Sequence, residues 1–138
     1  MAGTSEVSYW EQDGMYLSQT VGATAITLGT VVEIGATDGY VVTASSASTM
    51  VIGVAIAGYR ASRTATDNAV AAGGLITVAT RGIVNLSVAN GTVTRGDLVQ
   101  TYGAAGGIAT GATAVTTLTL GQALSTGTQT VKVKLMKG

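Results

Sequence analysis

Residues 130–135, Thr-Val-Lys-Val-Lys-Leu, alternate strictly between polar and apolar side chains. Successive side chains of a β-strand point to opposite faces, so this alternation predicts a strand with one face toward the core and the other toward water. Val131, Val133 and Leu135 are expected to point inward, and both lysines outward.

Short runs of the same kind recur along the rest of the chain, separated by Gly, Asn, Asp or Ser. Thr, Val and Ile make up 47 of the 138 residues, and these stiff β-branched side chains favour strands over helices. The pairs Asp38-Gly39 and Asn90-Gly91 predict tight turns. The fold class is therefore all-β. Strands are predicted at 16–21, 25–28, 31–34, 40–43, 50–57, 75–80, 82–88, 97–101, 107–110, 116–124 and 130–136.

An internal repeat relates the two parts of the chain. Residues 25–33 align with residues 92–100 at an offset of 67, and the register continues through the following hairpin to Gly53 and Gly121. Two similar β units can close on one another as a small β-barrel or sandwich, which removes exposed sheet edges. The expected organisation is one β-barrel domain over 16–138, with the quasi-repeat at 25–57 and 92–124. A Gly inside a strand predicts a bulge, a bend or a close backbone approach.

Composition argues against most enzymatic readings. The chain has no His and no Cys, so it lacks imidazole bases, thiolate nucleophiles, disulfides and the usual zinc ligands. Only 10% of residues are charged and the net charge is zero, which disfavours a nucleic-acid binder. No apolar run approaches membrane-spanning length. We expect no catalytic, cofactor-binding or metal-binding residues, no cofactor, no small-molecule substrate, and neither nucleic acid nor membrane as a partner.

The charges are nevertheless segregated along the chain. Residues 1–40 carry five acids and no base, whereas residues 41–138 carry seven bases and two acids. One interpretation is that solvated charges simply fall this way. The other is that the acidic end of one copy meets the basic surface of another copy or of a partner.

Two segments do not fit the strand pattern. Residues 1–15 form an expected N-terminal arm with Tyr9 and Trp10, next to Tyr16, and these aromatics either pack on the chain's own barrel or reach a neighbouring chain. Residues 58–74 form an expected long loop with Arg60 and Arg63 and a helical turn near 68–72, and it is either solvated or in contact with a partner. The candidate capsid or subunit contacts are Tyr9, Trp10, Tyr16, Arg60 and Arg63.

The residues of the repeat also carry a family resemblance. Residues 93–99, 120–124 and 131–135, together with 52–55 and 80–84, resemble the capsid cement or head decoration proteins of tailed phages. The resemblance implies a compact β-barrel that forms a homotrimer on the outer surface of the assembled capsid, with an N-terminal arm on the major capsid protein. It also implies a virion location after synthesis in the host cytoplasm.

Other functions remain open from the sequence. A tail or baseplate component, or another virion structural β protein, would use the same small-residue strands and subunit contacts. A carbohydrate-binding module would have to use the terminal aromatics as its platform. An ice-binding protein is suggested only by the alternating threonines at 126–130. The sequence favours a non-enzymatic virion structural protein that decorates and stabilises the phage head.

Overall fold

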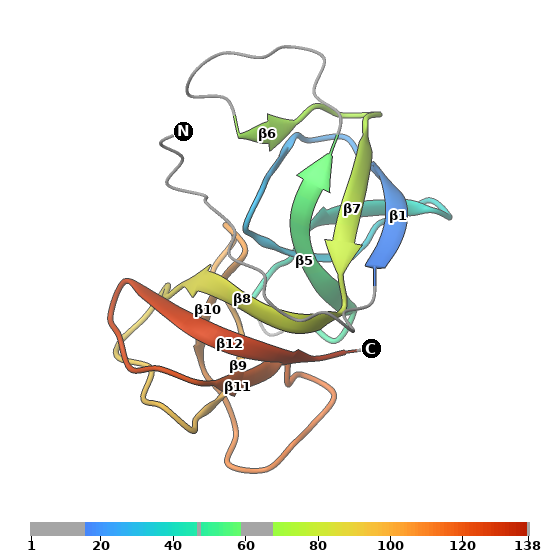
Figure 1. Ribbon diagram of the computed structural model, residues 1–138. Helices are drawn as coiled ribbons and strands as arrows, with labels where there is room; N and C mark the ends of the chain where they lie inside the picture. The colour runs from blue at the N-terminus through green and yellow to red at the C-terminus, as the bar shows by residue number, and fades with distance from the viewer. Residues whose placement is uncertain (1–15, 47, 59–67, 138) are drawn as a thin grey trace.

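The computed structural model of the protein describes residues 16–137, apart from residue 47 and residues 59–67. The described residues contain twelve strands and no helix, which confirms the all-β fold class (Figure 1). The strands of the first half are β1 (Tyr16–Val21), β2 (Ile26–Thr27), β3 (Val31–Ile34), β4 (Tyr40–Thr43), β5 (Val51–Gly58), β6 (Ala69–Val70) and β7 (Leu75–Ala79). Those of the second half are β8 (Arg81–Ser87), β9 (Leu98–Tyr102), β10 (Gly107–Thr110), β11 (Gly121–Ala123) and β12 (Thr130–Met136).

The first half forms a closed barrel on its own. Its strands follow one another in the order β1-β4-β3-β5-β7, and β7 pairs again with β1. All neighbours are antiparallel except β1 and β4, which run parallel with Val21 opposite Val41. The short strands β2 and β6 pair with each other beside this barrel (Figure 1). Closure leaves few unpaired strand edges in this half.

The second half has the same strand neighbours. Its sheet has the order β10-β9-β11-β12-β8, and a parallel bridge from Val88 to Ile108 brings its two ends together. That bridge lies 67 residues after the Val21–Val41 pair of the first half. Strands β8, β10, β9, β11 and β12 therefore occupy the places that β1, β4, β3, β5 and β7 hold in the first half.

Turn hydrogen bonds recur at the same offset. The N–H of Gly29 donates to the Ala55 carbonyl oxygen at 2.7 Å, and the N–H of Gly96 donates to that of Ala123 at 2.8 Å. Gly29 and Gly96 have φ angles of 93° and 95°, a region that favours glycine. The two halves thus share local geometry as well as strand order.

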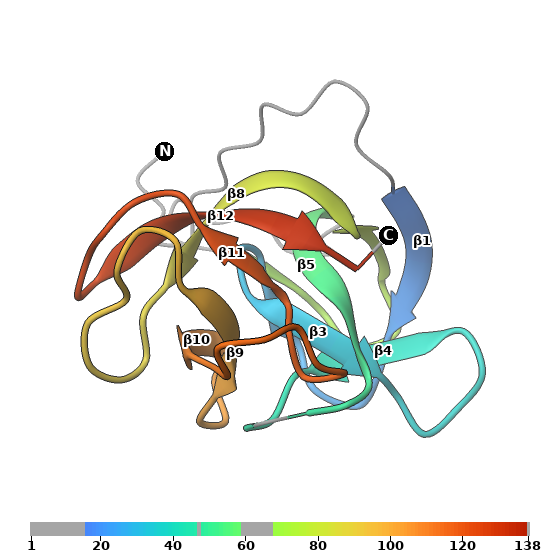
Figure 2. The same cartoon turned by 90° about the horizontal axis from the view of Figure 1, so that it is seen from below.

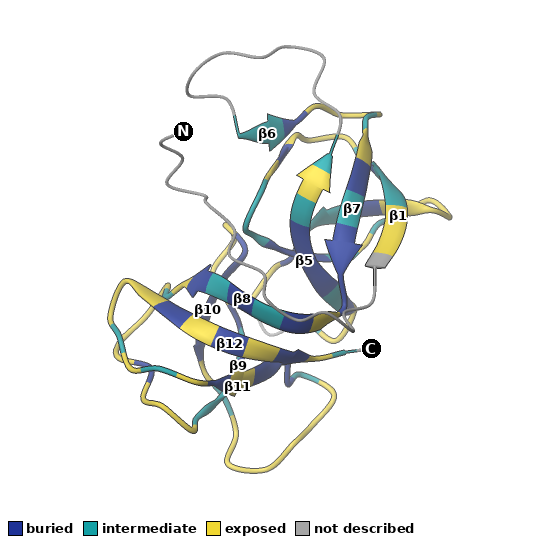
Figure 3. Ribbon diagram, viewed as in Figure 1, coloured by how far each residue is buried: buried dark blue, intermediate teal, exposed yellow. Residues whose placement is uncertain are grey.

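The apolar core has two clusters of buried residues. One lies inside the first barrel and contains Val21, Ile26, Val32, Val41, Ala55, Val70, Ile76 and Val78. The other fills the second half and also includes Val31, Ala44, Val51, Val54 and Ala79 of the first half. Neighbours such as Val31 and Val32 therefore serve different clusters, because each side of β3 is covered (Figure 3). This shared cluster packs the outside of the first barrel against the second half (Figure 2).

Most predicted strands are found within one or two residues of their predicted bounds, and β12 shows the predicted alternation of buried and exposed residues. The helical turn predicted near 68–72 is wrong. Ala69 and Val70 instead form β6, because pairing with β2 buries Val70 in the first cluster. The strand predicted at 116–124 is limited to Gly121–Ala123, since residues 116–119 form a turn closed by a Thr119 N–H to Thr116 carbonyl bond.

Candidate functional site

The predicted contact residues lie mostly outside the described part of the chain. Tyr9, Trp10, Arg60 and Arg63 fall within residues that the structure does not describe. Tyr16 begins β1, where its backbone pairs with Ala79 of β7 at the boundary between the two halves. A role for these five residues in contacts stays a prediction.

Basic side chains line the outer face of the second sheet. Lys132 and Lys134 alternate with buried residues along β12 and are exposed, as the sequence predicts. Arg81 lies on the neighbouring strand β8, opposite Met136. We call Arg81, Lys132 and Lys134 the basic sheet face.

The two halves carry opposite charge in their described residues. The first half has Glu33 and Asp38 and no base, whereas the second half has five bases and one acid, Asp97. Two of these acids organise their own turns. Glu33 Oε1 accepts hydrogen bonds from the Ser45 N–H at 3.0 Å and the Ser45 hydroxyl at 3.3 Å. Asp97 Oδ2 accepts from the Thr94 N–H and the Thr110 hydroxyl, both at 2.9 Å.

Large apolar side chains are exposed on both halves. Ile34 and Met50 are neighbours, because the N–H of Ile34 donates to the Met50 carbonyl at 3.0 Å, and each is about half exposed. Leu17 and Tyr40 are also exposed on the first half. On the second half the exposed set is Tyr102, Val115, Leu124 and Met136. Exposed apolar side chains on a small β protein indicate surfaces available for contact.

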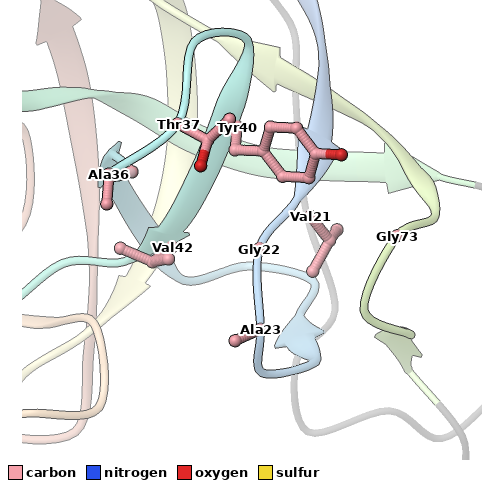
Figure 4. A pocket seen from close by; sticks show the side chains of 9 residues that line it. Val21, Gly22, Ala23, Ala36, Thr37, Tyr40, Val42 and Gly73 are labelled. Atoms are coloured by element: carbon pink, nitrogen blue, oxygen red, sulfur yellow. The ribbon is translucent and has the colours of Figure 1, made fainter.

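A pocket of about 380 Å³ opens between the ends of β1 and β4. It is lined by Val21, Gly22, Ala23, Gly35, Ala36, Thr37, Tyr40, Val42 and Gly73. Figure 4 shows the Tyr40 side chain extending across the pocket from the start of β4, and its walls carry only the hydroxyl groups of Thr37 and Tyr40 as polar side-chain groups. These groups suit an apolar side chain of a partner rather than acid–base chemistry. The sequence analysis missed this pocket, although the cluster of small residues at 22–23 and 35–37 was a usable signal.

Lys137 lies beyond the end of β12. Partial burial lowers the pKa of its ammonium group from the ordinary value of 10.5. The Nζ atom donates a hydrogen bond to the Thr117 carbonyl oxygen at 3.2 Å. This bond ties the C-terminal end to the long connection between β10 and β11.

No group of three or more acidic, His or Cys residues close enough to hold a metal ion occurs among the described residues. The described residues also contain no helix that could span a membrane.

Comparison with known proteins places the chain in a family. No curated protein sequence matches it. The family model described as XM1 gp53 minor capsid protein matches residues 4–135. Because this match covers both halves, the chain belongs to the XM1 gp53 minor capsid protein family and is a structural component of a phage virion.

Proposed function

We propose that this capsid protein is a decoration, or cement, protein that binds the outer surface of the assembled phage head as a trimer and stabilises the shell. The observation that carries this proposal is the family match, which spans both β units rather than one part of the chain. A minor capsid protein made of this compact unit has to act by attachment to a shell that another protein builds. The resemblance of its strand sequences to head decoration proteins supports the same role.

The composition of the core also favours dependence on assembly. The largest fully buried side chains are Ile, Leu and Val, and no aromatic residue is among the buried residues of the described chain. Small side chains bury less apolar area, at about 25 cal/mol per Å², and 20 glycines raise the entropic cost of folding. We therefore expect contacts with other subunits to contribute part of the stability.

Stabilisation of the shell follows from binding linkage. A protein that binds the assembled shell and not the dissociated subunits stabilises the shell by the free energy of that binding. At a free concentration about 100 times Kd, this contributes roughly 2.7 kcal/mol per site. The major capsid protein is the proposed partner, with Tyr9, Trp10, Tyr16, Arg60 and Arg63 as the proposed contacts.

The test uses phage heads assembled without this protein. Adding the purified chain should give binding that saturates at a fixed ratio to the major capsid protein, and it should raise the temperature at which heads release DNA to an intercalating dye. Binding to heads with an unchanged release temperature would contradict the cement role.

Isolated tails serve as the second binding target in the same experiment. The alternative, a tail or baseplate component, predicts that the protein sediments with tails and leaves heads bare. The capsid family match favours the head.

A further inference from the structure

Inside the chain, the first half covers one end of the second half. Val84, Thr101 and Leu120 of the second half are at most 1% exposed. Val84 and Leu120 lie in the cluster that also contains Val31, Val54 and Ala79 of the first half, and Thr101 Oγ1 accepts a hydrogen bond from the Ser48 N–H at 3.2 Å. We call this contact the intrachain interface.

The repeat identifies the matching end of the first half. The positions equivalent to Val84 and Thr101 are Leu17 and Ile34, and these are 39% and 48% exposed. We call Leu17 and Ile34, with the neighbouring turn at residues 36–40, the open end. Apolar side chains are therefore exposed where the second half buries its own.

Two glycines show the same difference in cover. Gly39 and Gly106 lie 67 residues apart in equivalent turns, with φ angles of 80° and 75°. A Cβ on Gly106 would stand 2.7 Å from the Thr30 Cβ, because that turn packs against the first half. A Cβ on Gly39 would meet no described atom within 4 Å. The turn of the open end thus lacks, among the described residues, the neighbour that its equivalent has.

The second half also presents a copy of the surface that does the covering. Val31, Val54 and Ala79 of the first half correspond to Leu98, Gln122 and Lys134, which pair in the same row across β9, β11 and β12. Gln122 and Lys134 are exposed and Leu98 is partly exposed. We call these three residues the covering face.

Loop geometry extends this correspondence. The N–H of Met50 donates to Ser48 Oγ at 3.0 Å, and the N–H of Leu118 donates to Thr116 Oγ1 at 3.1 Å. Thr116 therefore holds in the second half the place of Ser48, the residue that reaches Thr101 across the intrachain interface. Thr116 is exposed.

We propose that the covering face of one copy packs on the open end of a second copy, which repeats the intrachain interface between chains and joins the copies head to tail. Charge complementarity supports this occupant, since Glu33 and Asp38 flank the open end and Lys134 belongs to the covering face. Such a heterologous contact forms a ring when its rotation closes. The inference rests on the proposed trimer, in which three copies would place six β units around one axis.

The contact between chains should be weaker than the intrachain one. Gln122 and Lys134 replace Val54 and Ala79, so the contact buries less apolar area and depends more on charge. Association should therefore weaken as salt concentration rises.

Engineered cysteines test the contact directly, because the natural chain has none. The bond between Ser48 and Thr101 places their equivalents, Thr116 and Ile34, within the range that a disulfide spans. Ile34→Cys and Thr116→Cys are made as separate variants, mixed, and oxidised both in solution and on saturated heads. The expected product is a mixed dimer from the two variants together, with little dimer from either alone. The double variant should give a covalent trimer.

A matched pair controls for chance collision. Leu75 is 60% exposed, but its partner in the repeat is the exposed Thr130, outside the intrachain interface. Leu75→Cys mixed with Thr116→Cys should therefore cross-link no more than background. A dimer formed mainly between two Ile34→Cys chains, or no mixed dimer above this control on saturated heads, would overturn the proposal.

A second readout does not depend on disulfide geometry. Ile34→Asp should weaken association at least tenfold in sedimentation experiments, while Leu75→Asp leaves it unchanged, since both side chains are exposed in the single chain. Equal effects of the two variants would contradict the proposal. Heads that are stabilised without mixed cross-links remove this inference and keep the proposed function, whereas mixed cross-links in a protein that ignores heads do the reverse.

Discussion

The backbone N–H of Ser48 donates to the hydroxyl oxygen of Thr101 over 3.2 Å, and this bond joins the loop after β4 to strand β9 across the two halves. Thr101 is 1% exposed, although it occupies a strand position where the first half has Ile34. A hydroxyl group is retained in the interior because it satisfies a backbone donor that the loop brings there.

Thr101→Val tests the value of that bond. The substitution keeps the shape of the side chain and removes the acceptor, so the Ser48 N–H loses its partner in a partly buried position. We expect the free energy of unfolding to fall by about 1–2 kcal/mol. Urea denaturation measures this, with the exposed Thr113→Val as the control that should change stability by less than about 0.5 kcal/mol. Equal stability of the two variants would mean that the bond contributes nothing.

Gly53→Ala and Gly121→Ala should be among the most destabilising small substitutions. A Cβ on Gly53 would overlap the Ala79 carbonyl oxygen, and one on Gly121 would overlap that of Lys134. The backbone must shift to relieve each overlap, so we expect a loss of about 3 kcal/mol or more in urea denaturation. Gly91→Ala is the control, since a Cβ there meets nothing within 4 Å and only its φ of 68° is unfavourable. A loss at Gly53 no larger than at Gly91 would contradict the close approach.

The strands were predictable where one face is buried and the other is wet. Residues 130–136 show that regime, because the period of two appears directly in the side chains. The turns at Gly39 and Gly91 were predictable because Asp-Gly and Asn-Gly pairs reach positive φ at low cost, and both glycines have it.

Other features depend on pairing that no local pattern encodes. Val31 and Val32 are both buried, in different clusters, so their sequence does not say which side of β3 faces which half. The two-residue strands β2 and β6 form only through each other, across more than 40 residues of chain. The closure of the first barrel on itself follows from such contacts. Of the candidate contact residues, only the backbone of Tyr16 lies in the described part.

Lys137 should give stability a distinct dependence on pH. Its pKa is lowered by burial in the folded chain, so between that pKa and 10.5 the unfolded state binds more protons than the folded state. Stability contributed by this group therefore rises with pH through that window and is constant at neutral pH, where both states are protonated. Lys137→Arg keeps the charge throughout and should lack the rise. Urea midpoints of both proteins from pH 7 to 11 test this, and parallel curves would contradict it.

Removal of residues 1–14 should separate folding from attachment. The twelve strands all lie after this segment, so the truncated chain should keep its circular dichroism spectrum and its unfolding midpoint while losing binding to heads. Trp10→Ala should then weaken binding by about 2 kcal/mol, or roughly thirtyfold in Kd, because aromatic anchors dominate interfaces. Arg60→Ala, the matched control, should cost less than about 1 kcal/mol, as charges at an interface rim usually do. A truncated protein that saturates heads with unchanged affinity would show that attachment uses the β units themselves.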